Sequence, residues 1–494
     1  SDVCSSDLIQ FRIASDKDML RIYLDWNVII QLKAQAARLS DFNDFIRHNF
    51  NRLCIPYSHA HLKDMSSGSE EFPQFLTSEL EFLAELSHNN YMIYDYTSGK
   101  VEPFLVQPSK AFEGFNENNL DSMSIDAVLE HLDSESDMKF GKMIRCFISL
   151  LPNPHYMQKL PSCESGIFTE MANSITSSPS YYHLLKAVTE YNSQVYKDPV
   201  KYKSMRSETR KGLQIKPHQL STSDQPMEKI ESELRRISGN SDVGIMTALE
   251  TLKIDYPEFR TWLTDFFAIY LTLDYMGYHS DKINEKNKPD NLITDIMHTF
   301  YGAHCDYYIS CDKKAVAKAS QVYKELKIST KATSPELFLE EVARMDFEHP
   351  TIQDLVDKVS LTLRSNECFL SEISSVELPD ARGYVFKPVN AIFSYFNFLQ
   401  YIKFNDHFEV HLLHVNKNCS RFIFYYEIER IVDMFVIMLG PDIYGKQEVT
   451  PDEISTLDSF ERLWVIDTYL LSLIMSDVNQ SVLCKIMGSN TNMT

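Results

Sequence analysis

Two short segments at distant positions each place a carboxylate directly after an apolar, strand-like run. Residues 21–24 (Arg, Ile, Tyr, Leu) end at Asp25, and Asn27 follows two positions later. Residues 307–310 lead to Asp312 in the same way, and a helical pattern follows each acid. Open parallel sheets bind ligands beyond the carboxyl ends of their strands. We therefore expect both acids to face one crevice, where they could act together on a bound metal or phosphate.

The first 18 residues are set apart from the fold. Residues 1–8 resemble the translation of a sequencing-adapter tail, and Met19 stands immediately before the first strand. We expect residues 1–18 to be non-native or disordered, with the native chain starting at Met19. The alternative is an ordinary polar extension, and a native N-terminal peptide that begins before Met19 would demonstrate it.

The composition is that of a globular chain with more than one domain. The chain has 494 residues, of which 44% are hydrophobic and 24% are charged. No apolar run approaches the roughly 20 residues that a membrane helix needs, so no membrane association is expected. The nine cysteines form no CxxC pair, and no secretory signal precedes Met19. Free thiols and a cytoplasmic location are the simplest interpretation.

The formal net charge of -21 argues against broad, non-specific attraction to nucleic acid. Contact with nucleic acid must then be local, and the segment 199–216 is the most basic candidate. Its side chains could neutralise phosphates, and the alternative is a solvated, mobile loop. The residues proposed to bind nucleic acid are Lys201, Lys203, Arg206, Arg210 and Lys211.

Alternating strand and helix patterns predict an interrupted α/β domain. Strands are expected around 21–24, 53–56 and 91–96, with helices between them, and the alternation resumes at Asn291. This pattern predicts a parallel sheet flanked by helices. The expected divisions are a sheet domain in two parts (19–100 and 278–347), a large and mainly helical insertion (101–277) and a C-terminal α+β accessory domain (348–494).

The accessory domain is expected to mix short strands with three helices. The expected strands are 359–363, 383–388, 408–415 and 421–426. The expected helices are 389–399, 428–439 and 459–475.

Three motifs, in this order, resemble those of the PIN-like ribonuclease domains. The first is Tyr23, Leu24, Asp25, Trp26, Asn27 and Val28; the second is Pro56, Tyr57, Ser58, His61, Leu62 and Asp64; the third is Asp295 and His298, then Cys305, Asp306, Tyr307, Ile309, Ser310 and Asp312. The resemblance covers about residues 19–64 and 291–341. The second and third acids are much farther apart here than in a compact PIN domain, because the insertion separates them.

The resemblance implies a set of metal-binding, catalytic acids. Carried over by position, these acids are Asp25, Asp64, Asp295 and Asp312. For Asp64 the alternative is an acid on a solvated helix face.

Other residues of the motifs are expected to support the acids. Asn27 and Ser310 match positions where the family often has a polar residue, and Asp306 is counted with them. His298 lies three residues after Asp295, so it should share a helix face with that acid and touch a phosphate or steady a carboxylate. The alternative for His298 is a structural histidine in a polar patch.

Four converging carboxylates would repel one another unless cations neutralised them, which implies Mg²⁺ or Mn²⁺ as cofactor. One ion could lower the pKa of an attacking water, and a second, roughly 4 Å away, could stabilise the leaving oxygen. The sequence therefore predicts a metal-dependent phosphodiesterase, and the resemblance alone makes RNA the expected substrate of an endoribonuclease. The alternatives are a structure-selective DNA nuclease and a noncatalytic PIN-like scaffold for protein interaction. An inhibitor or regulatory protein is a further candidate partner, and the oligomeric state stays open.

Overall fold

A computed structural model provides the structure of the chain. It describes residues 19–71, 73–95, 98–117, 149, 173–174, 176–180, 183–187, 198–239, 241, 244–247, 249–250, 262–280, 289–342, 351–373, 381–393, 395–416, 418–420, 422–450, 453, 460–476 and 481–489. Residues 1–18 and much of the expected insertion lie outside this set. The chain divides into two compact units, one formed by Ser1–Phe112 with His298–Thr494 and the other by Glu113–Met297.

The first unit contains a four-stranded parallel sheet with the strand order β2-β1-β6-β7. Its strands are β1 (Leu20–Leu24), β2 (Leu53–Cys54), β6 (Tyr307–Ile309) and β7 (Lys331–Thr333). All residues of β1, β2 and β6 are buried, as expected for parallel strands that are covered on both faces. The chain is therefore mixed α/β, with a parallel sheet as predicted.

A second, smaller sheet continues this order. It contains β3 (Tyr57–Ser58), β4 (Asn90–Asp95) and β5 (Lys100–Leu105), with β3 parallel to β4 and β5 antiparallel to it. Only Ile55 and Pro56 separate β2 from β3, so one stretch of chain pairs first with β1 and then with β4. From β1 the chain continues to β2 on one side, whereas β6 and β7 are added on the other side of β1. The carboxyl ends of the parallel strands β1 and β6 therefore form a topological switch point.

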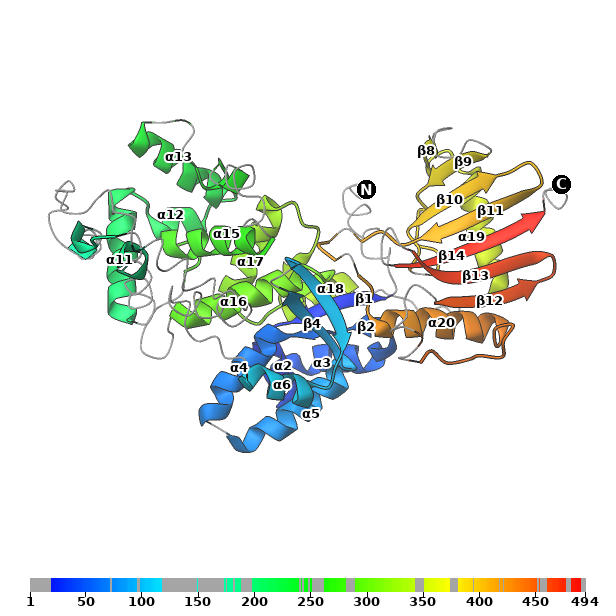
Figure 1. Ribbon diagram of the computed structural model, residues 1–494, viewed down its shortest axis with the longest axis horizontal. Coiled ribbons are helices and arrows are strands. Elements are labelled where there is room, and N and C mark those ends of the chain that lie inside the picture. The colour runs from blue at the N-terminus through cyan, green and yellow to red at the C-terminus, as the bar shows by residue number, and fades with distance from the viewer. Residues whose placement is uncertain are drawn as a thin grey trace, which may run out of the picture. The chain divides into compact units, whose positions relative to one another are not determined.

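Helices of this unit follow the strands and flank the parallel sheet (Figure 1). They are α2 (Trp26–Lys33), α3 (Ser40–His48), α4 (His59–Glu71), α5 (Leu76–Ser87), α17 (Lys313–Glu325) and α18 (Pro335–Val342). Helix α16 (Pro289–Gly302) leads into β6. At its last residue, Gly302, a Cβ atom would lie 2.9 Å from side-chain atoms of Tyr308 and Tyr323, so the close packing there requires glycine.

The C-terminal part of the same unit carries a separate, antiparallel sheet of seven strands, ordered β12-β13-β14-β11-β10-β9-β8. The strands are β8 (Phe369–Ile373), β9 (Arg382–Phe386), β10 (Phe398–Lys403), β11 (His407–Leu413), β12 (Glu461–Ile466), β13 (Tyr469–Ser476) and β14 (Ser481–Ser489). Helices α19 (Ile352–Arg364) and α20 (Tyr425–Leu439) bury apolar side chains in the core of this sheet (Figure 1, yellow to red).

Several expected elements of this part were wrong. The expected strand 359–363 lies inside α19, where Thr351 and Asp354 form a capping box that starts the helix. The expected helix 459–475 is instead the hairpin of β12 and β13, because the chain turns at Asp467, which has a φ of 52°. The expected strand 421–426 overlaps the start of α20, and the described residues of the expected helix 389–399 form no helix.

A buried ion pair joins the four-stranded parallel sheet to helix α20, which packs on the antiparallel sheet. Arg21 on β1 is 1% exposed, and its guanidinium lies 2.7 Å from the Glu427 carboxylate on α20. The same guanidinium donates to Ser420 Oγ and to the carbonyl oxygen of Phe422. Burial by itself lowers the pKa of Arg21, but the charge and hydrogen bonds of Glu427 raise it above its ordinary value. The antiparallel sheet is thereby fixed to the central parallel strand.

The second unit is helical where the structure describes it. Its helices include α11 (Pro199–Gly212), α12 (Pro217–Ser221), α13 (Pro226–Ser238) and α15 (Trp262–Met276). The apolar helix α15 buries the side chains of Phe266, Ile269, Tyr270 and Leu273. Among the described residues of the whole chain, no helix combines the length and apolarity needed to cross a bilayer.

We expect Glu427→Gln to lower the free energy of unfolding by about 3–5 kcal/mol, because the Arg21 charge would stay buried without its partner. Urea unfolding followed by circular dichroism measures this loss. The double variant Arg21→Met with Glu427→Leu should recover much of the lost stability, since no buried charge is then left unpaired. A Glu427→Gln protein as stable as the wild type would contradict this role.

A second prediction concerns His304, which is buried with both ring nitrogens unpartnered among the described residues. Burial, followed by the charge of Arg21, lowers the pKa of His304 to about 3. Below pH 6.5, His304 binds a proton in the unfolded chain but stays neutral in the folded chain. The free energy of unfolding therefore decreases as the pH falls from about 6.5 towards 3. Between pH 6.5 and 5 this amounts to about 2 kcal/mol.

We therefore expect His304→Phe to remove about 2 kcal/mol of the destabilisation between pH 7.5 and pH 5. Phenylalanine should fit, because the His304 ring already stacks on Phe422 with centroids 5.7 Å apart. Urea unfolding at the two pH values is the measurement, and His218→Phe, at an exposed histidine, is the control. An unchanged pH dependence in His304→Phe would refute the assignment.

Candidate functional site

Backbone pairing of β1 with β6 brings the first acid to the second motif strand. Asp25 directly follows β1, and its N–H donates to the carbonyl oxygen of Ile309, the last residue of β6, at 2.9 Å. Asp25 is also the N-cap residue of α2. The ladder thus continues one step past the strands and sets Asp25 beside Ser310.

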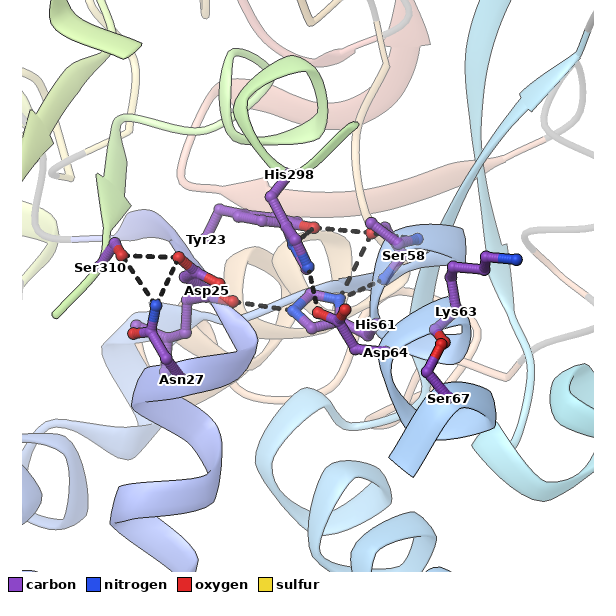
Figure 2. A network of polar contacts seen from close by, with 12 residues as sticks. Tyr23, Asp25, Asn27, Ser58, His61, Lys63, Asp64, Ser67, His298 and Ser310 are labelled. Atoms are coloured by element: carbon purple, nitrogen blue, oxygen red, sulfur yellow. Dashed lines mark hydrogen bonds and ion pairs between the residues drawn. The ribbon is translucent and has the colours of Figure 1, made fainter. Parts of the chain in front are cut away.

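One oxygen of the Asp25 carboxylate is held by three donors. Oδ2 accepts hydrogen bonds from Ser310 Oγ at 2.6 Å and from Asn27 Nδ2 at 2.8 Å (Figure 2). The Tyr308 hydroxyl also donates to it, at 3.2 Å. The residue is only 7% exposed. Within the described part of the chain, the other oxygen, Oδ1, accepts no hydrogen bond. The carboxylate is therefore fixed in orientation with one oxygen still available to a ligand.

Asp312 lies next to this group. Its N–H donates to Ser310 Oγ at 3.0 Å, and its Oδ1 accepts from the Lys314 N–H at 2.8 Å, which caps α17. Asn27 connects the same segment from the other side, since its Oδ1 accepts from the Cys311 N–H at 2.9 Å. The structure thus brings together four predicted residues: Asp25, Asn27, Ser310 and Asp312.

A second group contains Asp64 and His298. Asp64, on α4, accepts a hydrogen bond from His298 Nε2 at 2.8 Å. His298 Nδ1 lies 2.8 Å from the hydroxyl of Tyr23 on β1, and that hydroxyl lies 2.7 Å from Ser58 Oγ (Figure 2). His298 is 2% exposed, and the Asp64 side chain is 28% exposed. A continuous hydrogen-bonded chain therefore runs from a buried strand to a partly solvated acid.

His61 connects the two groups. Its Nδ1 accepts from the Ser58 N–H at 2.9 Å, and its Nε2 donates to the carbonyl oxygen of Leu24, the residue before Asp25, at 2.8 Å. Burial, followed by the charge of His298, lowers the pKa of His61 well below 6.5, although its bond to Leu24 opposes the shift. His61 is therefore neutral at neutral pH and ties α4 to the end of β1.

One predicted supporting residue, Asp306, lies away from Asp25. Asp306 precedes β6, where its Oδ2 accepts from the Arg21 N–H at 3.0 Å. It lies at the amino end of the strand, about 13 Å along the chain from Ser310, so its expected supporting role is not borne out by its position. Asp295 is half-buried on α16 and belongs to the second compact unit.

The five basic residues predicted to bind nucleic acid lie on α11, in the second unit, and not in a loop. Arg206 is 5% exposed and pairs with Asp274, with 3.2 Å between NH1 and Oδ2. Arg210 donates to the carbonyl oxygens of Asp274 and Tyr275 near the end of α15, and burial lowers the pKa of Arg210 to about 10. These two arginines hold helices together, which leaves Lys203 and Lys211 as the fully exposed cations of the set.

The carboxylates fit a hard divalent cation in chemistry but do not form a cage. Among the described residues, no group of three or more His, Cys, Asp or Glu side chains could hold a metal ion. Mg²⁺, however, is often bound by one or two carboxylates, with waters and substrate phosphates completing its shell. Asp25 suits that mode, because a ring of donors orients it as such rings orient metal ligands.

Four residues of these groups were missed by the sequence reasoning as site residues: Tyr23, Ser58, His61 and Tyr308. The alternation of side chains in a strand could have indicated two of them. Tyr23 and Tyr308 lie two residues before Asp25 and Ser310, respectively, and so share their faces. Ser58 has the general signal of a hydroxyl just before a helix.

Comparisons with protein-family models, with curated proteins and with solved structures found no match for this chain. The function is therefore inferred from the geometry of the chain's own residues.

We expect Ser310→Ala to lower the free energy of unfolding by about 1–3 kcal/mol, because the Asp312 N–H and the Asn27 amide lose a buried acceptor. Ser67→Ala is the matched control, since its hydroxyl makes an exposed bond to the Lys63 carbonyl oxygen and should change stability by less than about 0.5 kcal/mol. Urea unfolding compares the two, and equal effects would show that Ser310 has no special part in the group.

Proposed function

We propose that this protein is a metal-dependent phosphodiesterase, and specifically a PIN-like endoribonuclease that uses Mg²⁺ or Mn²⁺. The observation that carries the proposal is the Asp25 carboxylate, which is buried, anchored through one oxygen and located at the switch point between β1 and β6. Ligands of open α/β sheets bind at this place. A carboxylate held there needs a cation or a positive ligand more than it needs further hydrogen bonds.

The fold supports the proposal at the level of topology. The strand order β4-β3/β2-β1-β6-β7 keeps the strands that carry the three motifs adjacent and parallel. Residues at their carboxyl ends then meet at one edge, as the PIN-like resemblance requires. The N-termini of α2 and α17 lie at this edge as well, and their dipoles favour an anionic group such as a phosphate.

Each acid has a distinct task in the proposed mechanism. Asp25 would hold the metal through Oδ1, because Ser310, Asn27 and Tyr308 already donate to Oδ2. Asp64 presents its second oxygen in the same way, because His298 occupies Oδ2. Asp312 adds negative charge beside Ser310, and Asp295 is retained as the fourth acid of the motif. When bound, the metal would activate water and stabilise the leaving oxygen.

The choice of RNA and of a cytoplasmic location comes from the PIN-like resemblance and from the free thiols. Four buried or half-buried cysteines of the described residues are free: Cys54, Cys311, Cys368 and Cys484. Free thiols are typical of a reducing compartment.

We expect Asp25→Asn to reduce cleavage of a fluorescent RNA oligonucleotide in Mn²⁺ by at least about 100-fold, because a neutral amide is a poor ligand for a hard cation. The fold should survive, since asparagine keeps one oxygen as acceptor, and circular dichroism checks this. Asp306→Asn is the matched control, because it removes an acid at the opposite end of β6 and should leave cleavage unchanged.

The same assay separates the competing functions. Cleavage of a matched DNA oligonucleotide in preference to RNA would support a DNA nuclease. Wild-type protein that cleaves neither nucleic acid, and that binds no Mn²⁺ in titration calorimetry, would support a noncatalytic scaffold and reject the proposal.

A further inference from the structure

We propose that Tyr23 and His298 are positioning residues that hold the Asp64 carboxylate in the orientation needed to bind the metal, an inference that rests on the proposed function. Asp64 projects from α4, and the only ring that anchors it among the described residues belongs to His298. Tyr23 in turn fixes His298 to the central strand β1. Asp25 and Asp64 are then anchored separately but to the same strand.

The direction of each hydrogen bond in this chain follows from chemistry. A carboxylate can only accept, so His298 Nε2–H donates to Asp64 Oδ2. In the tautomer that carries its proton on Nε2 alone, Nδ1 accepts and the Tyr23 hydroxyl donates to it at 2.8 Å. The Tyr23 oxygen then accepts from Ser58 Oγ–H, and Ser58 Oγ accepts from the Ala60 N–H at 3.2 Å. Every donor in the chain meets an acceptor, which gives the chain one preferred arrangement.

The His298 ring has little freedom to turn. It contacts the Tyr23 ring, with centroids 5.7 Å apart, and meets the His61 ring edge-on at 4.9 Å. Tyr23 is fully buried, so water does not compete for its hydroxyl. The ring that orients Asp64 is therefore fixed by packing as well as by hydrogen bonds.

An ordinary surface ion pair does not account for this arrangement. Exposed pairs are weak because water competes for both groups. His298 is 2% exposed, whereas the Asp64 side chain keeps 28% of its surface in contact with solvent. The buried partner thus holds a carboxylate that stays partly exposed to solvent.

The test uses two substitutions that keep different halves of the histidine. The amide nitrogen of His298→Gln can reach the place of Nε2 and donate to Asp64. His298→Asn ends near the place of Nδ1, so it can meet Tyr23 but falls short of Asp64. We expect His298→Asn to weaken Mn²⁺ binding by about 10–100-fold in titration calorimetry, and His298→Gln to restore the affinity to within about threefold of the wild type.

Thermal melting without metal provides the second readout. Both variants should melt at similarly reduced temperatures, because each loses one buried hydrogen bond. Tyr23→Phe should weaken Mn²⁺ binding, and Tyr444→Phe, at an exposed tyrosine, is its matched control.

The possible outcomes are distinct. If the wild type binds Mn²⁺ and His298→Asn binds it equally well, the positioning role is wrong and the proposed function stands. If both His298 variants lose Mn²⁺ affinity in proportion to their loss of melting temperature, His298 has only a structural role. That result would overturn the inference. If the wild type binds no Mn²⁺, both the proposed function and the positioning role are wrong.

Discussion

The parallel pairing of β1 with β6 is the constraint on which the site depends. These strands come from opposite ends of the sheet's sequence, and the pairing Ile22↔Tyr307 to Leu24↔Ile309 sets their register. A shift by one residue would turn Asp25 and Ser310 to opposite faces of the sheet. The 2.6 Å contact between them exists only in the observed register. The hydrogen bonds around Asp25 can therefore form only once β1 and β6 have paired.

Local sequence predicted these two motifs well because the signal is local. A mostly apolar run with an acid at or just beyond its end indicates a buried parallel strand, and both β1 and β6 are buried parallel strands. The hydrogen-bonded chain was harder to predict, because Tyr23 reads as an apolar strand residue. Its partner His298 lies 275 positions away, and no local pattern predicts the hydrogen bond between the two side chains.

The antiparallel sheet was predicted poorly for a related reason. Leu463, Leu471 and Ile474 belong to a leucine- and isoleucine-rich stretch that fits a helix as well as a hairpin. The pairing of β13 with β14 and the packing of the core against α20 stabilise the hairpin rather than a helix. On α11, the sequence did not reveal that Arg206 pairs with Asp274 and that Arg210 donates to the Tyr275 carbonyl oxygen, so both arginines already bond to α15.

The position of Arg21 also limits how this chain can be divided. The strand that presents Asp25 at one end carries, four residues earlier, a guanidinium whose partners Ser420, Phe422 and Glu427 all lie beyond the parallel sheet. A fragment that stops after α18 would keep every acid of the motifs yet leave a bare cation in an apolar interior. The part of the chain that carries the motif acids is thus not a self-sufficient module, and loss of the C-terminal domain would first require a replacement of Arg21 in the opening strand.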